Sequence, residues 1–374
     1  MNTLKMNKKD AAVTFVSFLI SSFLLKYYEV FNRDEREIFI FGTVENVVII
    51  RGKGFVNGEH RRSLVMAMEE VSFPSFSEKD TIQGWIYTPI RKPRGIVQIV
   101  HGFGEHSRRY MHMILALNEA GYVVAADDHI GHGKTASDSG NWSDWGDKGY
   151  KTMAEDEHTL RKIVQEKHPH LPFVMFGHSM GSMITRSYAA MYGEGIDGVV
   201  LCGTSGHFPT AQEMNATLYK EIEDGNGEEV NDAYLNQLMG WMTERIPHPD
   251  TPNDWISIDP DVVSDHAKDP FNNFTSIPNI RSLYYFTEMM LQINGTTWAA
   301  QVPLSLPIYN IAGDHDPVGQ YGEGVYAVSN WLAETGHEVA TKLYPGYRHE
   351  IHNNRAIREE VVAGIIDFVH GVTS

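Results

Sequence analysis

A serine stands at the centre of the pentapeptide at 177–181, where glycines flank it two positions away on either side. This Gly-x-Ser-x-Gly pattern leaves room for a strained turn that joins a strand to a helix and exposes the serine hydroxyl. An apolar run at 173–176 predicts the strand, and 182–191 predicts the helix. A chance match would lack this context, so we predict that Ser179 is a nucleophile.

A serine hydroxyl needs an imidazole base, and in folds of this kind the chain order is serine, acid, histidine. The segment at 344–350 follows the predicted last strand and ends in His349 and Glu350. His352 is the competing base, and we expect it to lie already in the closing helix. We therefore predict His349 as the base.

The acid should follow the apolar strand predicted at 306–312. Asp314 and Asp316 both stand there, and either could instead cap a turn through its own backbone. The residues alone leave this choice open.

Acyl transfer also requires N–H donors for the developing oxyanion. The residue after a nucleophile of this type supplies one donor, which here is the backbone of Met180. The second is expected from the glycine-rich turn at 101–106, at the backbone of Phe103.

Other chemistries fit the chain less well. The run at 127–132, Asp-Asp-His-Ile-Gly-His, has metal-ligand residue types, but a structural turn is the better interpretation and we predict no metal. Neither Gly-x-Gly-x-x-Gly nor a P-loop lysine motif is present, which disfavours a dinucleotide enzyme. A formal net charge of -17 disfavours nucleic-acid binding. The single cysteine, Cys202, lies in an apolar run and is expected to be buried.

From about residue 69 short apolar strands alternate with amphipathic helices, which is typical of an α/β fold with a mostly parallel sheet covered on both faces. The alternation stops at 205–303, a stretch too long for a structureless loop. We predict a core formed by 69–204 and 304–374, and an inserted, mainly helical cap at 205–303.

The first 65 residues form an extension with an uncharged stretch at 11–25, preceded by lysines at positions 5, 8 and 9. This order predicts an uncleaved membrane anchor and a membrane-associated protein, although a full span needs about 20 residues. The alternatives are a plain hydrophobic helix, or a true translation start at Met66 or Met68 and a cytoplasmic protein.

The ordered set of motifs resembles the monoacylglycerol lipase and lysophospholipase group of α/β-hydrolases, which is similar to the serine aminopeptidases. The resemblance spans roughly 69–371 and rests on the segments at 101–107 with Arg109 and Tyr110, 128–135, 177–182, 313–318 and 344–350. His129 departs from the arginine of many relatives, at a position that is usually structural. The resemblance implies the α/β-hydrolase fold with its cap, esterase or lipase activity, no metal and no organic cofactor. It also favours Asp316 as the acid, three residues after the glycine.

The expected substrate is a small lipid-like ester, a monoacylglycerol or a lysophospholipid, cleaved through an acyl-enzyme. Methionines beside aromatic residues suit an adaptable apolar channel for an acyl chain. We expect five residues of the cap to contact substrate: Met239, Trp241, Trp255, Phe286 and Met289.

Three alternatives use another acyl substrate: an aryl or feruloyl ester, a thioester, or a peptide in a proline-type aminopeptidase. An aminopeptidase needs an acidic clamp, for which the cap offers Asp250, Asp254, Asp259 and Asp261. A non-catalytic binding protein is disfavoured, because Ser179, Asp316 and His349 are all present.

Overall fold

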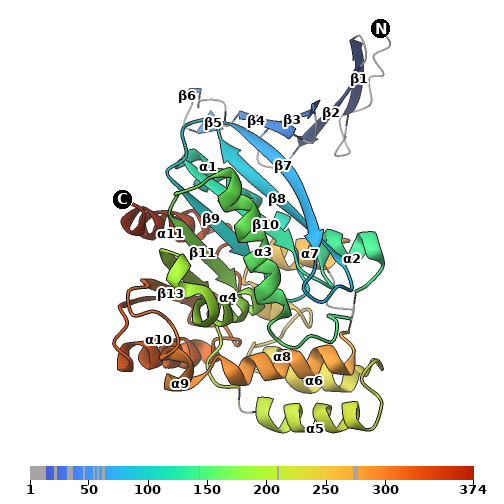
Figure 1. The fold of residues 1–374 in the computed structure, drawn as a ribbon, viewed down its shortest axis with the longest axis vertical. Helices are drawn as coiled ribbons and strands as arrows, with labels where there is room; N and C mark the ends of the chain where they lie inside the picture. The colour runs from blue at the N-terminus through green and yellow to red at the C-terminus, as the bar shows by residue number, and fades with distance from the viewer. Residues whose placement is uncertain are drawn as a thin grey trace.

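The computed structural model describes residues 66–374 except 143, 209 and 273–276, together with the backbone of strands between residues 14 and 65. Its centre is a twisted sheet in the order β1-β2-β3-β4-β7-β8-β10-β9-β11-β12-β13-β14 (Figure 1). The strands from β7 onward are Leu64–Pro74, Thr81–Pro89, Gly95–Val100, Tyr122–Asp128, Phe173–His178, Gly198–Cys202, Ile308–Gly313 and Val339–Tyr344.

The strands β9 to β14 pair in parallel, whereas β7 and β8 pair antiparallel at one side. Every residue of β9, β10, β11 and β12 is buried, as expected for parallel strands covered on both faces. The strands predicted from the sequence lie where expected to within about two residues. Because parallel strands share a direction, the turns that follow β9, β11, β13 and β14 gather at one edge of the sheet.

Helices cover both faces of the sheet (Figure 1). One face packs against α1 (Met111–Glu119) and α11 (Arg358–Val372), through residues such as Leu117 and Ile365. The other packs against α3 (Thr152–Lys167), α4 (Met180–Tyr192) and α10 (Glu323–Glu334), through residues such as Leu160 and Ile184. A short helix, α2 (Gly133–Ser139), follows β10.

The segment between β12 and β13 is mainly helical, as the sequence predicts. It contains α5 (Ala211–Glu223), α6 (Asp232–Met239), α7 (Pro260–Lys268), α8 (Ile280–Gln292) and α9 (Gly295–Ala299). Figure 1 shows α5, α6 and α8 gathered beyond one end of the sheet. Buried residues of α8, including Leu283, Phe286 and Met290, belong to the same apolar cluster as α4. The inserted segment is therefore packed onto the sheet domain.

The first strands continue the sheet as an antiparallel meander beyond β7. They are β1 (Thr14–Ile20), β2 (Phe23–Phe31), β3 (Glu37–Val44) and β4 (Val47–Lys53), with a small hairpin of β5 (Phe55–Val56) and β6 (Glu59–His60). Of the apolar stretch at 11–25, residues 11–13, 21 and 22 lie outside the described residues, and the rest is strand. The helix alternative is therefore wrong for 14–20 and 23–25, whose aromatic and β-branched side chains favour strands. Within the part of the chain that the structure describes, every helix is too short or too polar to cross a bilayer.

We expect a protein that begins at Met66 to unfold cooperatively on heating, because the described residues from 66 onward bury two large apolar clusters. Far-UV circular dichroism of the full and shortened proteins would measure this. Loss of cooperative unfolding would show that the first strands are required by the core. Pelleting of only the full-length protein with lipid vesicles would support the predicted anchor.

Candidate active site

Ser179 occupies the sharp turn between β11 and α4, with the strained backbone angles φ 56° and ψ -122°. A Cβ added at Gly177 would collide with the Gly181 carbonyl, and one at Gly181 would collide with the carbonyls of Val100 and His101. The glycines of the pentapeptide are therefore required by close backbone packing. The turn is fixed further by a 2.9 Å bond from Ser179 N to Cys202 O.

His349 and Asp316 are joined by a 2.8 Å hydrogen bond from His349 Nδ1 to Asp316 Oδ2, and both side chains are buried. The second oxygen of Asp316 accepts a bond from Val318 N at 2.9 Å. Because Nδ1 carries the proton, Nε2 of His349 holds a free lone pair, and it has no hydrogen-bond partner. Ser179 and His349 line one small cavity, so the imidazole and the hydroxyl face a shared space.

The competing residues lie elsewhere. Asp314 accepts a 2.6 Å bond from Gly346 N and is partly exposed, so it caps the loop after β14. His352 precedes α11, which begins only at Arg358, so its expected place in the closing helix is wrong. Its ring stacks on Tyr110 at 4.9 Å, and its Nδ1 lies 3.9 Å from the sulfur of the buried Cys202. Residues 350–354 form a separate turn, closed by a bond from Asn354 N to Glu350 O, before the helix begins.

The turn that carries Phe103 is held against the serine. A Cβ on Gly102 would lie 3.0 Å from that of Ser179. The backbone N–H of Gly102 donates to Glu105 Oε1 at 2.7 Å. The same oxygen accepts bonds from the Tyr110 hydroxyl at 2.7 Å and from His178 Nδ1 at 2.9 Å. Glu105 thus joins this turn to the strand end that precedes the serine.

An ion-pair network extends this connection to the histidine loop. Arg109 Nη1 lies 2.8 Å from Glu105 Oε2 and 2.6 Å from Glu350 Oε1. Burial alone would raise the pKa of Glu105, but the bond from His178 and the charge of Arg109 hold it well below 4.5. The carboxylate of Glu105 therefore stays ionised at neutral pH. Removing one of its partners would leave a buried charge uncompensated.

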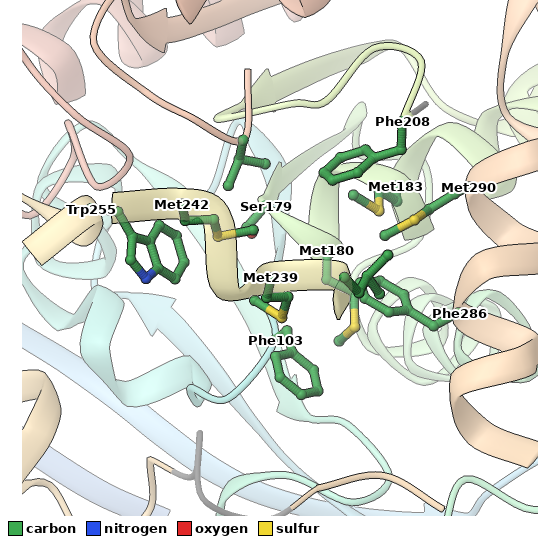
Figure 2. A pocket seen from close by; sticks show the side chains of 12 residues that line it. Phe103, Ser179, Met180, Met183, Phe208, Met239, Met242, Trp255, Phe286 and Met290 are labelled. Atoms are coloured by element: carbon green, nitrogen blue, oxygen red, sulfur yellow. The ribbon is translucent and has the colours of Figure 1, made fainter. Parts of the chain in front are cut away.

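An apolar cavity opens beside Ser179 (Figure 2). Methionines from α4, α6 and α8, together with phenylalanine and tryptophan rings, surround the space next to the serine. Its lining consists of Phe103, Ser179, Met180, Met183, Phe208, Leu238, Met239, Met242, Trp255, Phe286, Met290 and Val318. A space of this apolar character suits an acyl chain.

The residues expected to contact substrate divide into two groups. Met239, Trp255 and Phe286 line the cavity. Trp241 and Met289 are not among the lining residues: Trp241 packs near Phe208 and donates from its indole N–H to Leu238 O, and Met289 is buried in the main apolar cluster. Met289 lies next to Met290 on α8, and adjacent helical residues point about 100° apart.

Sequence reasoning missed several lining residues, including Met183, Phe208 and Val318. Met183 lies one helical turn after Met180, so its spacing could have indicated it. Phe208 and Val318 come from turns after β12 and β13, and their convergence depends on the three-dimensional path of the chain.

The run at 127–132 builds a turn, as the sequence predicts. Asp128 accepts bonds from Ser107 N and Oγ, from Arg108 and from Lys134 N. His132 Nδ1 donates to the Ile130 carbonyl at 2.9 Å. These contacts use Asp128 and His132 to fix the backbone.

Comparisons with known proteins agree with this geometry. The pattern of the family described as serine aminopeptidase, S33, matches residues 91–356. A monoacylglycerol lipase from Mycolicibacterium smegmatis is 28% identical over 286 residues, covering 75% of this chain and 91% of that protein. A thermostable carboxyl esterase from Bacillus coagulans, solved in complex with glycerol, is 70% identical with a TM-score of 0.81, covering 82% of this chain and 99% of that one. A lipase solved in an open form is 40% identical with a TM-score of 0.77, over the same shares.

The chain therefore has the α/β-hydrolase fold and is a serine hydrolase of the carboxylesterase and monoacylglycerol lipase type. It belongs to the serine aminopeptidase S33 family.

We expect Asp316→Asn to lower kcat by on the order of 10,000-fold, as loss of a triad carboxylate does when the imidazole adopts the wrong tautomer. Asp314→Asn is the matched control, and it should cost about 1 kcal/mol of stability through the bond to Gly346 while leaving turnover largely intact. Steady-state kinetics on a soluble aryl ester would measure both, and the reverse ranking would transfer the acid role to Asp314.

The pH dependence of turnover should report His349. Burial disfavours the charged imidazole, but the Asp316 carboxylate outweighs it and raises the pKa of His349 above 6.5. A protonated imidazole cannot accept the serine proton, so kcat/KM should fall as pH drops through a midpoint above 6.5. A pH profile of kcat/KM between pH 5 and 8 would test this, and a midpoint clearly below 6.5 would contradict it.

Proposed function

We propose that this protein hydrolyses monoacylglycerols through a covalent acyl-enzyme, with Ser179 as nucleophile and His349 as general base. Asp316 holds the imidazole in the tautomer whose Nε2 accepts the serine proton, which the 2.8 Å bond to Nδ1 supports. The backbone N–H groups of Phe103 and Met180 stabilise the oxyanion.

The reaction follows from these roles. Ser179 Oγ attacks the ester carbonyl while its proton passes to His349 Nε2, and the imidazolium then protonates the departing glycerol oxygen. Water replaces the alcohol and attacks the acyl carbon while its proton passes to His349 Nε2. The bond to Ser179 Oγ then breaks, the imidazolium returns the proton to Oγ, and the fatty acid is released. The N-terminus of α4 begins at Met180 and adds its positive dipole end to the oxyanion site.

The apolar cavity beside Ser179 is the observation that carries the substrate assignment. Apart from the serine, the residues that line it are all hydrophobic. An acyl chain buried there gains about 0.8 kcal/mol for each methylene removed from water. Five of the lining residues are methionines, whose flexible side chains accommodate chains of different shape. The inserted segment supplies much of this lining, in keeping with a cap that selects the substrate.

The smaller cavity next to Ser179 suits an uncharged alcohol. Its lining includes the carboxylates of Glu105 and Glu350, together with His266, whose pKa burial lowers to about 4. The phosphate of a lysophospholipid would meet negative charge there, whereas glycerol hydroxyls could form hydrogen bonds. A monoacylglycerol is therefore preferred over a lysophospholipid.

An aminopeptidase would need a carboxylate free to bind the substrate amine, whereas Glu105 and Glu350 in the smaller cavity are both paired with Arg109. The acidic residues that could have formed such a clamp are used elsewhere: Asp259 and Asp261 pair with Arg355, and Asp254 caps its own turn. Asp250, Asp254, Asp259 and Asp261 are absent from the described lining of both cavities. The site thus favours an ester over a peptide.

The test is a substrate panel at equal concentration: monoacylglycerols of increasing chain length, lysophosphatidylcholine, an aryl ester, a thioester and a proline aminoacyl amide. We expect the highest kcat/KM for a monoacylglycerol. Ser179→Ala should lose on the order of 10⁵-fold or more of this activity while keeping the wild-type melting temperature. A fluorophosphonate should label the wild type alone.

Two results would contradict the proposal. If labelling and turnover persist in Ser179→Ala, Ser179 is not the nucleophile. A preference for the aminoacyl amide or the lysophospholipid would be compatible with Ser179 as the nucleophile, but it would contradict the assignment of a monoacylglycerol as the substrate.

A further inference from the structure

A buried polar cluster lies behind the Phe103 turn and has no part in the proposed reaction. It joins Gln98 on β9, Asp127 on β10, His129 just after β10, and Glu157 on α3. All four are at most 1% exposed. His129 Nδ1 lies 3.3 Å from Glu157 Oε1 and 3.7 Å from Asp127 Oδ1. Titratable groups buried this deeply are costly unless they are neutral or well partnered.

His129 contacts the turn that carries Phe103 at several points. Its backbone N–H donates to His101 Nε2 at 3.0 Å, and its Nε2 lies 3.1 Å from the His101 carbonyl. The two rings stack with centroids 3.8 Å apart. His101 Nδ1 lies 2.8 Å from the Gly102 carbonyl. His129 therefore supports the two residues that precede Phe103.

The partners fix the tautomer of each ring. His101 Nε2 accepts a bond from an N–H, so its proton is on Nδ1 and is donated to the Gly102 carbonyl. His129 Nε2 faces a carbonyl and must donate, so in the neutral ring Nδ1 is an acceptor. Nδ1 faces only carboxyl oxygens, and one of them must carry a proton to bond to it.

We infer that Asp127 and Glu157 hold a proton beside His129, and that His129 is thereby a positioning residue for the turn that supplies the Phe103 oxyanion donor. This inference rests on the proposed function of that turn.

The electrostatics of the cluster agree with this arrangement. Burial raises the pKa of Asp127 to about 8, and the charges of Asp156 and Asp128 act in the same direction. Burial and the charge of Asp127 hold the pKa of Glu157 well above 4.5. Burial, reinforced by His132, lowers the pKa of His129 to about 3, so the ring stays neutral. At neutral pH the carboxyl pair therefore retains a proton, which Asp127 can hold, and the imidazole is neutral.

Loss of one proton to solvent would rearrange the cluster. When Asp127 ionises, its negative charge raises the pKa of Glu157 and draws the remaining carboxyl proton away from His129. Nδ1 of His129 then faces oxygen without a proton. The ring regains a bond there by moving its proton from Nε2 to Nδ1, and it loses the bond to the His101 carbonyl. Turnover should therefore decline with rising pH through a midpoint near 8.

The first test compares His129→Gln with His129→Asn. The longer amide can place its N–H where imidazole Nε2 stands and can donate to the His101 carbonyl, whereas the shorter one cannot reach it. We expect His129→Asn to lower kcat about tenfold with KM unchanged, a smaller loss than removal of an oxyanion donor itself. It should weaken binding of a trifluoromethyl ketone, which forms a tetrahedral adduct, by a similar factor. His129→Gln should recover most of both.

The second test records the alkaline side of the kcat profile. Glu157→Gln supplies a permanent N–H to His129 Nδ1, so the decline near pH 8 should move upward by more than one pH unit. Asp156→Asn is the matched control on the same helix. It does not contact His129, and it removes a charge that raises the pKa of Asp127, so the decline should move to lower pH.

Several outcomes would overturn the inference. These are equal kcat in the wild type and both His129 variants, a loss confined to KM, and an alkaline decline that is absent or unmoved in Glu157→Gln. Ligand atoms of Asp127, His129 and Glu157 lie within 4.8 Å of one another, so a stoichiometric metal found by mass spectrometry would also overturn it. A wild type without esterase activity would instead reject the proposed function.

Discussion

The close approach of Gly181 to the carbonyls of Val100 and His101 is the constraint on which the site depends. It brings the first turn of α4 against the end of β9, so the nucleophile and the Phe103 turn lie side by side. Any side chain at 181 would separate them. The strained φ of Ser179 is maintained because the strand before it and the helix after it are both fully packed. The sheet thus stabilises a backbone conformation that an isolated peptide would not keep.

Buried charged residues also fix the position of the loop that carries His349. Glu105, Arg109 and Glu350 connect the Phe103 turn with the residue next to His349. A buried ion pair contributes little net stability compared with apolar packing, but its geometry is specific. The bond from Glu350 N to Ile256 O also ties this loop to the inserted segment. Movement of the inserted segment would therefore shift the loop that carries His349.

Much of the fold and of the candidate site could be predicted from the sequence because the signals are local. The strand at 173–178 and the turn around Ser179 depend on a short apolar run and on glycine spacing. The choice between Asp314 and Asp316 did not follow from such a pattern, because both stand in one loop and only the path of β14 brings His349 to Asp316. The cavity lining was predicted only in part, because it too depends on how distant segments come together in space. Met289 and Met290 have equal hydrophobicity, and only the rotation of α8 decides which one lines the cavity.

The two cavities that meet at Ser179 differ in chemistry, and this difference orients an ester. The larger space is apolar and lies toward α6 and α8, whereas the smaller contains imidazoles and carboxylates. An acyl chain in the polar space would lie against carboxylates and imidazoles, and a glycerol headgroup in the apolar space would lose its hydrogen bonds. Both reversed contacts are unfavourable, so the carbonyl carbon is presented to Ser179 in one orientation. Phe103 lines both spaces, so the residue proposed to carry an oxyanion donor also stands at the boundary where the proposed reaction places the scissile bond.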